Sequence, residues 1–130
     1  MSEEKKLRLM FEQPSTEIGP NGRLHWTRKF AQVRKLRQKC KLLTLQVLHA
    51  YPEFSGFRPK TYDIEWFYTY GVEPDEDNIL GRCKGMLDGI ADALKMDDRL
   101  WHFGNIVRTK VSASDPFSGK VVLIFKAAEA

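Results

Sequence analysis

This chain of 130 residues is 42% hydrophobic and 29% charged, and its formal net charge at pH 7 is +4. That composition is ordinary for a soluble globular protein, and the length is sufficient for one domain with a hydrophobic core. Residues 1–10 are charged, and the longest apolar run, residues 121–125, is too short to span a bilayer, so we expect neither a signal peptide nor a membrane partner. The distant cysteines Cys40 and Cys83 form no disulfide or zinc pattern, so we expect a reducing cytoplasm.

The first half of the chain predicts a strand, a long helix and a second strand. Residues 5–12 alternate apolar and charged side chains, which predicts the first strand. A loop with two prolines and two glycines follows, and Thr27 is then placed to cap a helix that ends near residue 50. The apolar face of this helix includes Phe30. Residues 60–70 are rich in β-branched and aromatic side chains, which predicts a central strand covered on both faces.

The second half predicts one more helix and two more strands. Apolar side chains recur at steps of three and four over about residues 77–94, which predicts the helix. Two strands are predicted over about residues 105–112 and 120–125, and the turn signals at residues 114–119 predict that they form a hairpin. The order β-α-β-α-β-β predicts an α+β fold over residues 1–130, as one domain whose mixed sheet packs against two helices.

Acidic side chains are concentrated on both sides of the second helix. Asp75 and Asp77 are two residues apart, so an extended backbone directs both carboxylates to one face. Asp97 and Asp98 follow the helix, and Lys84 lies within it. Clustered carboxylates repel one another unless a hard cation such as Mg²⁺ holds them. Carboxylates, Mg²⁺ and a lysine are sufficient for phosphodiester hydrolysis, because the reaction needs a positioned water and neutralised phosphate charge.

Each of these residues also has an ordinary structural interpretation. An acidic residue in front of a helix is usually an N-cap. A lysine and an aspartate four residues apart, such as Lys84 and Asp88, usually form a surface salt bridge. The coincidence of Asp75, Asp77, Lys84 and Asp98 within one short unit favours the functional interpretation.

The acidic residues belong to a longer motif, which reads Asp75-Glu76-Asp77-Asn78, then Lys84, then Leu87-Asp88-Gly89-Ile90, then Asp97-Asp98. This motif resembles that of the RusA family of Holliday-junction resolvases, which are small phage-derived endonucleases. An early segment is similar to the R-x-H-W segment that leads into a basic helix in that family, and it reads Arg23-Leu24-His25-Trp26-Thr27-Arg28. The resemblance covers about residues 6–126, and the predicted order of elements is compatible with it.

The resemblance implies a homodimer that uses Mg²⁺ to make paired nicks across a four-way DNA junction, and it implies a phage or prophage origin. By motif position, it implies that Asp75, Asp77 and Asp98 are catalytic carboxylates that bind the metal. It also implies that Lys84 is the essential lysine. Either Asp97 or Asp98 fits the last ligand position, and we favour Asp98.

The sequence departs from the family in the spacing between the Asp-Asn pair and the lysine, where about three extra residues are present. An ungapped match would put Gly81 and Gly85 in the places of the lysine and the following aspartate. We prefer the gapped match, because it keeps Lys84 and Asp88 four residues apart.

The first predicted helix is strongly basic, with no acidic residue between Arg28 and Lys41. Helix faces that only confer solubility usually mix charges of both signs, so we predict that this helix contacts DNA phosphates. The sequence has no groove-reading motif, which favours recognition of DNA shape and backbone over base readout. The predicted contact residues are Arg28, Lys29, Arg34, Lys35 and Arg37.

The sequence therefore predicts a Mg²⁺-dependent structure-specific endodeoxyribonuclease that resolves Holliday junctions in DNA recombination or repair. Two alternatives stay open. One is a non-catalytic protein that binds branched DNA and uses its acidic residues as helix caps. The other is a metal-dependent nuclease with a different substrate, such as a flap, a nick or RNA.

Overall fold

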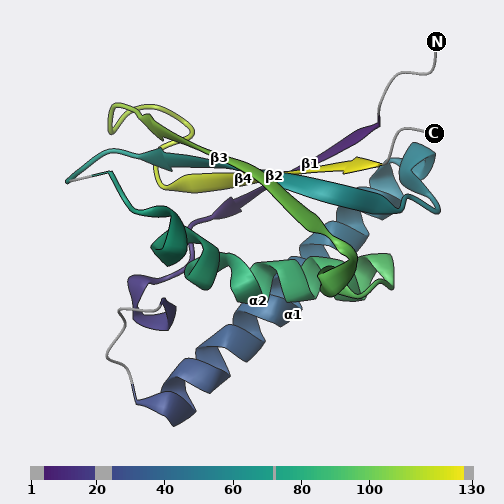
Figure 1. Cartoon of the computed structure of the whole chain (residues 1–130), viewed down its shortest axis with the longest axis horizontal. Coiled ribbons are helices and arrows are strands. Elements are labelled where there is room, and N and C mark those ends of the chain that lie inside the picture. Colours follow the sequence, from purple (N-terminus) through teal and green to yellow (C-terminus); the bar gives the residue numbers. More distant parts are fainter. Residues whose placement is uncertain (1–4, 20–24, 72, 128–130) are drawn as a thin grey trace. The chain divides into compact units, whose positions relative to one another are not determined.

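The computed structural model describes residues 5–19, 25–71 and 73–127. The elements follow the predicted order (Figure 1), with β1 at Lys6–Glu12, α1 at Trp26–Ala50, β2 at Pro59–Tyr68, α2 at Glu76–Leu94, β3 at His102–Lys110 and β4 at Lys120–Ala127. Short 3-10 helices lie at Thr16–Ile18 (η1), Pro52–Phe54 (η2) and Asp98–Leu100 (η3). The predicted α+β class is confirmed.

The chain forms two compact units whose segments alternate along the sequence. The sheet unit comprises residues 1–13, 57–73 and 99–130, and the helix unit comprises residues 14–56 and 74–98. Because neither unit is a continuous stretch of sequence, this division agrees with the prediction of one sequence domain. In the described part of the chain, no helix has the length and apolar character needed to cross a membrane.

The sheet is mixed, as predicted, with the strand order β1-β4-β2-β3 (Figure 1). Strand β4 lies antiparallel to both β1 and β2, whereas β3 lies parallel to β2. The predicted hairpin between the last two strands is therefore wrong. Parallel strands need a long crossover, and α2 belongs to the one between β2 and β3. Directly after β3, the Val111 amide donates to the Tyr68 carbonyl (2.8 Å) and ends the ladder between β3 and β2. The chain then returns as β4, which lies between β2 and β1.

The core of the sheet unit is built on β1, β2 and β4. In β1, burial alternates with exposure, as the period of two in its sequence predicts. Strand β2 lies between β4 and β3, so its predicted central place is confirmed. Its Ile64 and Trp66 side chains are buried, whereas the alternate side chains Glu65 and Phe67 are only partly covered, so the two faces are covered unequally. The strand with successive buried positions is β4, at residues 121–125. Its run of apolar residues is typical of a central strand.

In the helix unit, α1 and α2 cross at close range (Figure 1). The close approach depends on glycines in α2, which recur at a spacing of four and so lie on one face. A Cβ atom on Gly89 would overlap the Arg37 carbonyl oxygen, and one on Gly85 would lie 3.1 Å from a methyl group of Val33. The α1 backbone therefore occupies the space that a side chain at position 89 would need.

Two predictions about α1 are wrong. The N-cap is His25, whose side chain accepts a hydrogen bond from the Thr27 amide (3.3 Å), whereas Thr27 lies inside the helix. Phe30, which was expected on the buried face, is 61% exposed. The fully buried side chains of α1 are instead those of Cys40 and Thr44.

Candidate functional site

A charged cluster on the exposed face of α2 contains three of the residues singled out by the sequence motif. The Lys84 Nζ atom lies 3.0 Å from Asp98 Oδ2 and 3.4 Å from Asp88 Oδ1. The lysine side chain is 66% exposed, whereas the two aspartates are mostly covered. Lys84 and Asp88 meet because residues four apart lie on one side of a helix. These three residues are called the Lys84 cluster below.

Asp98 reaches the cluster because of the way in which α2 ends. Lys95 adopts a left-handed conformation (φ 57°, ψ 46°), and the Met96 amide donates to the Ala91 carbonyl (3.0 Å). This arrangement is typical of a helix C-terminus that turns the chain sharply. The turn allows Asp98, the first residue of η3, to approach Lys84, which lies in the middle of α2.

The pKa of Asp88 is set by its surroundings in the Lys84 cluster. Burial raises the pKa of Asp88, and the neighbouring Asp98 carboxylate raises it further, whereas the Lys84 ammonium group lowers it. The hydrogen bond with Asp98 raises the pKa of Lys84, which keeps its side chain cationic at neutral pH. With one ammonium group between two carboxylates, the cluster keeps an excess of negative charge that a further cation would relieve.

Asp75 and Asp77 lie at the other end of α2. Asp75 is the N-cap, because its Oδ1 atom accepts a hydrogen bond from the Asn78 amide (2.7 Å). Asp77 lies in the first turn and is exposed. At a rise of 1.5 Å per residue, Asp77 and Asp88 are separated by about 16 Å along the helix axis. The structure thus divides the predicted acidic residues between two places.

No group of three or more His, Cys, Asp or Glu side chains in residues 5–19, 25–71 and 73–127 could hold a metal ion. The predicted trio of Asp75, Asp77 and Asp98 is therefore not assembled within one chain. Mg²⁺, however, often uses only one or two protein carboxylates and completes its coordination with water and phosphate oxygens. Asp88 and Asp98 supply two carboxylates, so the Lys84 cluster could hold Mg²⁺ in this way.

An ion pair next to the Lys84 cluster joins α2 to α1. The guanidinium group of Arg37 binds Asp92 through two hydrogen bonds, from Nε to Oδ2 (2.7 Å) and from Nη2 to Oδ1 (2.8 Å). Asp92 lies one turn after Asp88 on α2, so Lys84, Asp88 and Asp92 form one row. The sequence analysis did not single out Asp92, although the repeated spacing of four was a signal that could have found it.

The predicted DNA contacts of α1 differ in how free they are to bind phosphate. Arg28 and Lys35 are exposed, and Arg34 lies over the ring of Phe30, 5.0 Å from its centroid. The Lys29 Nζ atom donates to the Gly19 carbonyl (3.1 Å), and Arg37 is held by Asp92 as described. Arg23, part of the segment that resembles the family, lies outside the described residues.

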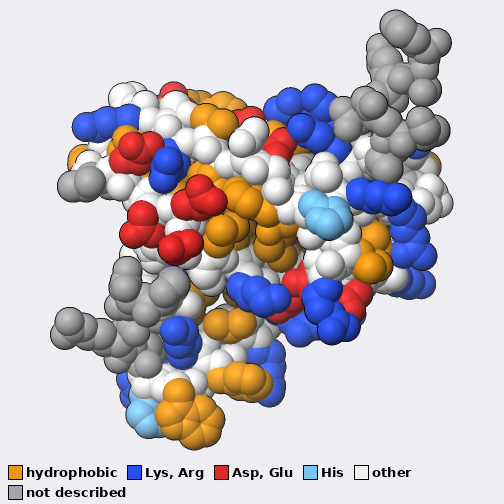
Figure 2. All heavy atoms as spheres, in the orientation of Figure 1, with side chains coloured by type: hydrophobic (Ala, Val, Ile, Leu, Met, Phe, Trp, Pro, Cys, Tyr) orange, Lys and Arg blue, Asp and Glu red, His pale blue; other side chains and the backbone are white. Residues whose placement is uncertain are grey.

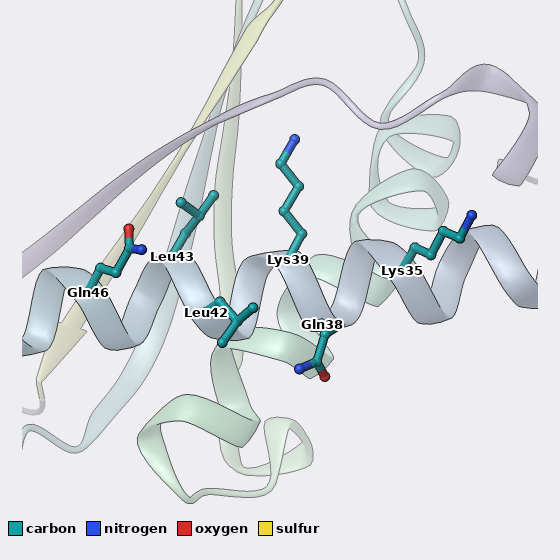
Figure 3. Close-up of a pocket in the computed structure, with 6 residues that line it drawn as sticks. All are labelled: Lys35, Gln38, Lys39, Leu42, Leu43 and Gln46. Atoms are coloured by element: carbon teal, nitrogen blue, oxygen red, sulfur yellow. The ribbon is translucent and has the colours of Figure 1, made fainter.

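An open hollow of about 450 Å³ runs along α1 (Figure 3), and its lining residues are Lys35, Gln38, Lys39, Leu42, Leu43 and Gln46. Figure 3 shows Lys35 and Lys39 on one side of the helix, with Gln38 on the other. Ammonium and amide groups along an open helix surface are suitable donors for phosphate oxygens. The hollow combines these donors with the apolar side chains of Leu42 and Leu43.

The two cysteines are not candidate nucleophiles. Both are free and buried. Burial raises the pKa of Cys40 to about 11 and that of Cys83 to about 12, so both thiols stay protonated at neutral pH. Both side chains are therefore packing residues of their helices.

No protein-family model matches this sequence. The chain is similar to a protein of Xylella fastidiosa strain Temecula1 that is named only as an uncharacterized protein. The two are 36% identical over 94 residues, which is 66% of this chain and 56% of that protein. The chain therefore spans little more than half the length of the relative it matches, and the relative's name states no activity.

Proposed function

We propose that this protein is a Mg²⁺-dependent endodeoxyribonuclease that acts on branched DNA, with the four-way junction of the RusA family as its substrate and a homodimer as its active form. The Lys84 cluster is the observation that carries this proposal. It combines a pair of carboxylates with an exposed lysine, and it lies beside a basic helix to which Arg37 and Asp92 connect it. Those are the groups that phosphodiester hydrolysis requires.

Each part of the helix unit has a role in this mechanism. Asp88 and Asp98 would hold Mg²⁺, which when bound supplies charge neutralisation and activation of the attacking water. Lys84 extends into solvent and offsets negative charge on the phosphate that is cut. The cations of α1 bind the phosphate backbone on either side and hold the strand in place.

Asp75 and Asp77 keep a proposed role as ligands, but within one chain they are too far from the Lys84 cluster to share a metal with it. In the proposed homodimer, a second copy would have to bring them there. Both cysteines are free thiols, which is compatible with the proposed cytoplasmic location.

The test is a gel assay on a labelled synthetic four-way junction, with a linear duplex as substrate control, in Mg²⁺ and in EDTA. We expect paired nicks on the junction in Mg²⁺ alone, lost in Asp98→Asn and Asp88→Asn with junction binding retained. Glu76→Gln is the matched control, because Glu76 is exposed in the first turn of α2 and has no assigned role. Equal loss in this control would overturn the assignment.

Asp77→Asn separates the two possible ligand sets. We expect it to abolish cleavage while junction binding stays intact or becomes tighter, because a repulsive charge is removed from beside the phosphates. Full cleavage by Asp77→Asn together with none by Asp98→Asn would restrict the site to the Lys84 cluster. Loss of both binding and cleavage would overturn the role of Asp77. A substrate panel with flaps, nicks and RNA tests the junction preference.

A second candidate is a protein that binds branched DNA without cutting it. Two observations favour it: Asp75 is used as a helix cap, and Lys84 already neutralises much of the charge of Asp98. Junction binding without cleavage in Mg²⁺, Mn²⁺ or any other divalent metal would establish this candidate and overturn the first.

A further inference from the structure

Two aromatic side chains are exposed at the start of α1. Trp26 is 73% exposed and Phe30 is 61% exposed. All three tryptophans lie in the described part of the chain, and the other two, Trp66 and Trp101, are only 1% and 6% exposed. Figure 2 shows hydrophobic side chains and a histidine on the surface at the end of α1 where the helix begins. Exposed apolar side chains that adjoin one another mark interaction sites more often than single ones do, and these two lie one helical turn apart.

The two rings form a row with cations. Trp26, Phe30 and Arg34 are spaced four residues apart, so they lie along one side of the helix. The Arg34 guanidinium group lies over the Phe30 ring, 5.0 Å from its centroid, so it covers part of one face of the ring and adds a positive charge beside it. The sequence of α1 contains no Asp or Glu, so the charged side chains around this row on α1 are all basic.

The same row leads to the Lys84 cluster. Continuing from Arg34 by three residues reaches Arg37, which binds Asp92 on α2. Asp92 and Asp88 are one turn apart on α2, and Asp88 belongs to the Lys84 cluster. Phe30 lies about 10 Å along the helix axis from Arg37. The helix unit thus places three features one after another in space: the aromatic side chains, the cations of α1 and the Lys84 cluster.

We propose that Trp26 and Phe30 form a stacking platform for unpaired bases of a nucleic-acid strand whose phosphates are bound by Arg34 and the other cations of α1. This inference deepens the proposed function, because it specifies which feature of branched DNA the protein recognises. Bases in a duplex have their faces covered by stacking, whereas unpaired bases offer a π-face to an aromatic side chain. The positive charge around the rings favours a polyanion over an apolar partner surface.

The first measurement is tryptophan fluorescence during titration with single-stranded oligothymidylate in EDTA, where no cleavage occurs. Because the other two tryptophans are buried, the signal from Trp26 is the one that base stacking would quench. We expect quenching that saturates with bound DNA. The blunt-ended duplex of the same length is the control, and it should bind with little quenching.

Variants then test the energetic role of the platform. Stacking is worth about 1–3 kcal/mol per base, so Trp26→Ala and Phe30→Ala should each weaken single-strand binding by about 5- to 150-fold. Trp26→Phe should keep most of the affinity, because it keeps a ring. Leu45→Ala is the control, since Leu45 is also an exposed apolar residue of α1 (39%) but lies outside the row. Affinity unchanged in both alanine variants would overturn the proposal.

The other possible occupant of the aromatic surface is a second copy of this chain. If Trp26→Ala and Phe30→Ala convert a dimer to a monomer in sedimentation and leave single-strand binding per chain unchanged, the surface is a dimer contact and the platform is wrong. The test is also independent of catalysis. Stacking without cleavage would contradict the proposed nuclease activity and support the platform. Cleavage together with unchanged single-strand binding in the alanine variants would support the nuclease activity and contradict the platform.

Discussion

The Nζ atom of Lys84 and the Oδ2 atom of Asp98 lie 3.0 Å apart and join the middle of α2 to the residue that opens η3. The pair is exposed on its lysine side and mostly covered on its aspartate side. Such a contact has two possible roles, because it can hold the end of α2 in place or present a cation beside a carboxylate for chemistry. The two roles predict different consequences of removing the lysine.

Lys84→Met should lower junction cleavage by about 10²–10³-fold, as removal of one preorganised charge-stabilising donor does in other enzymes. Its free energy of unfolding should change by less than about 1 kcal/mol, because exposed ion pairs contribute little. Single-turnover cleavage and urea unfolding measure the two effects. The control is Lys60→Met, which removes an exposed lysine of β2. A large loss of stability with unchanged cleavage would assign Lys84 a structural role.

Asp75 offers a comparison between capping and metal binding. Asn caps a helix about as well as Asp, whereas Ala costs about 0.5–2 kcal/mol. Asp75→Asn should therefore keep the free energy of unfolding within a few tenths of a kcal/mol, and Asp75→Ala should lower it by about 1 kcal/mol. If Asp75 is also a metal ligand, both variants lose cleavage. Cleavage retained by the asparagine variant would leave the cap as its only role.

The sequence predicted local structure well where the signal is local. The alternation in β1 and the periodicity of α2 each depend on neighbouring residues, and both elements appear close to the predicted bounds. The hairpin failed because a turn signal at residues 114–119 does not determine which strand the chain pairs with next. Register and strand order depend on contacts between distant segments, which a turn motif does not encode.

In the candidate site, too, the local contacts were predictable from the sequence and the contacts between distant residues were not. The pairing of Lys84 with Asp88 follows from a spacing of four, and it is present. The approach of Asp98 depends on the left-handed residue Lys95, which no strong signal marks, because glycine is the usual residue there. The exposure of Phe30 was missed because periodicity assigns a face without showing where the neighbouring helix stops covering it.

Gly89→Ala should destabilise the protein more than Gly85→Ala. At position 89 the new Cβ would meet the backbone of α1, which cannot yield without moving the helix, so we expect a loss of about 1–3 kcal/mol. At position 85 the nearest atom is a Val33 methyl group, which can shift by a few tenths of an ångström. Alanine also favours the helix by about 1 kcal/mol, so Gly85→Ala should be nearly neutral. Thermal unfolding of both variants checks this order, and equal effects would contradict it.

The pair between Arg37 and Asp92 should make stability depend on pH in the acid range. The hydrogen bond from Arg37 lowers the pKa of Asp92 below its ordinary value of 3.8. A depressed carboxyl pKa adds stability above the unfolded value, and that contribution disappears as the pH falls through the folded value. Both side chains are partly exposed, so the contribution at pH 7 is about 0.5–1 kcal/mol.

Asp92→Asn should therefore be less stable than the wild type at pH 7, and the difference should shrink toward zero as the pH falls below 3.8. Urea unfolding of both proteins at a series of pH values measures this difference directly, because contributions from the other carboxylates cancel between them. Asp115→Asn provides the control, since Asp115 lies in the turn that precedes β4, where its carboxylate accepts a hydrogen bond from the Phe117 backbone amide (2.8 Å). A difference that persists unchanged at low pH would mean that Asp92 acts through packing and not through its charge.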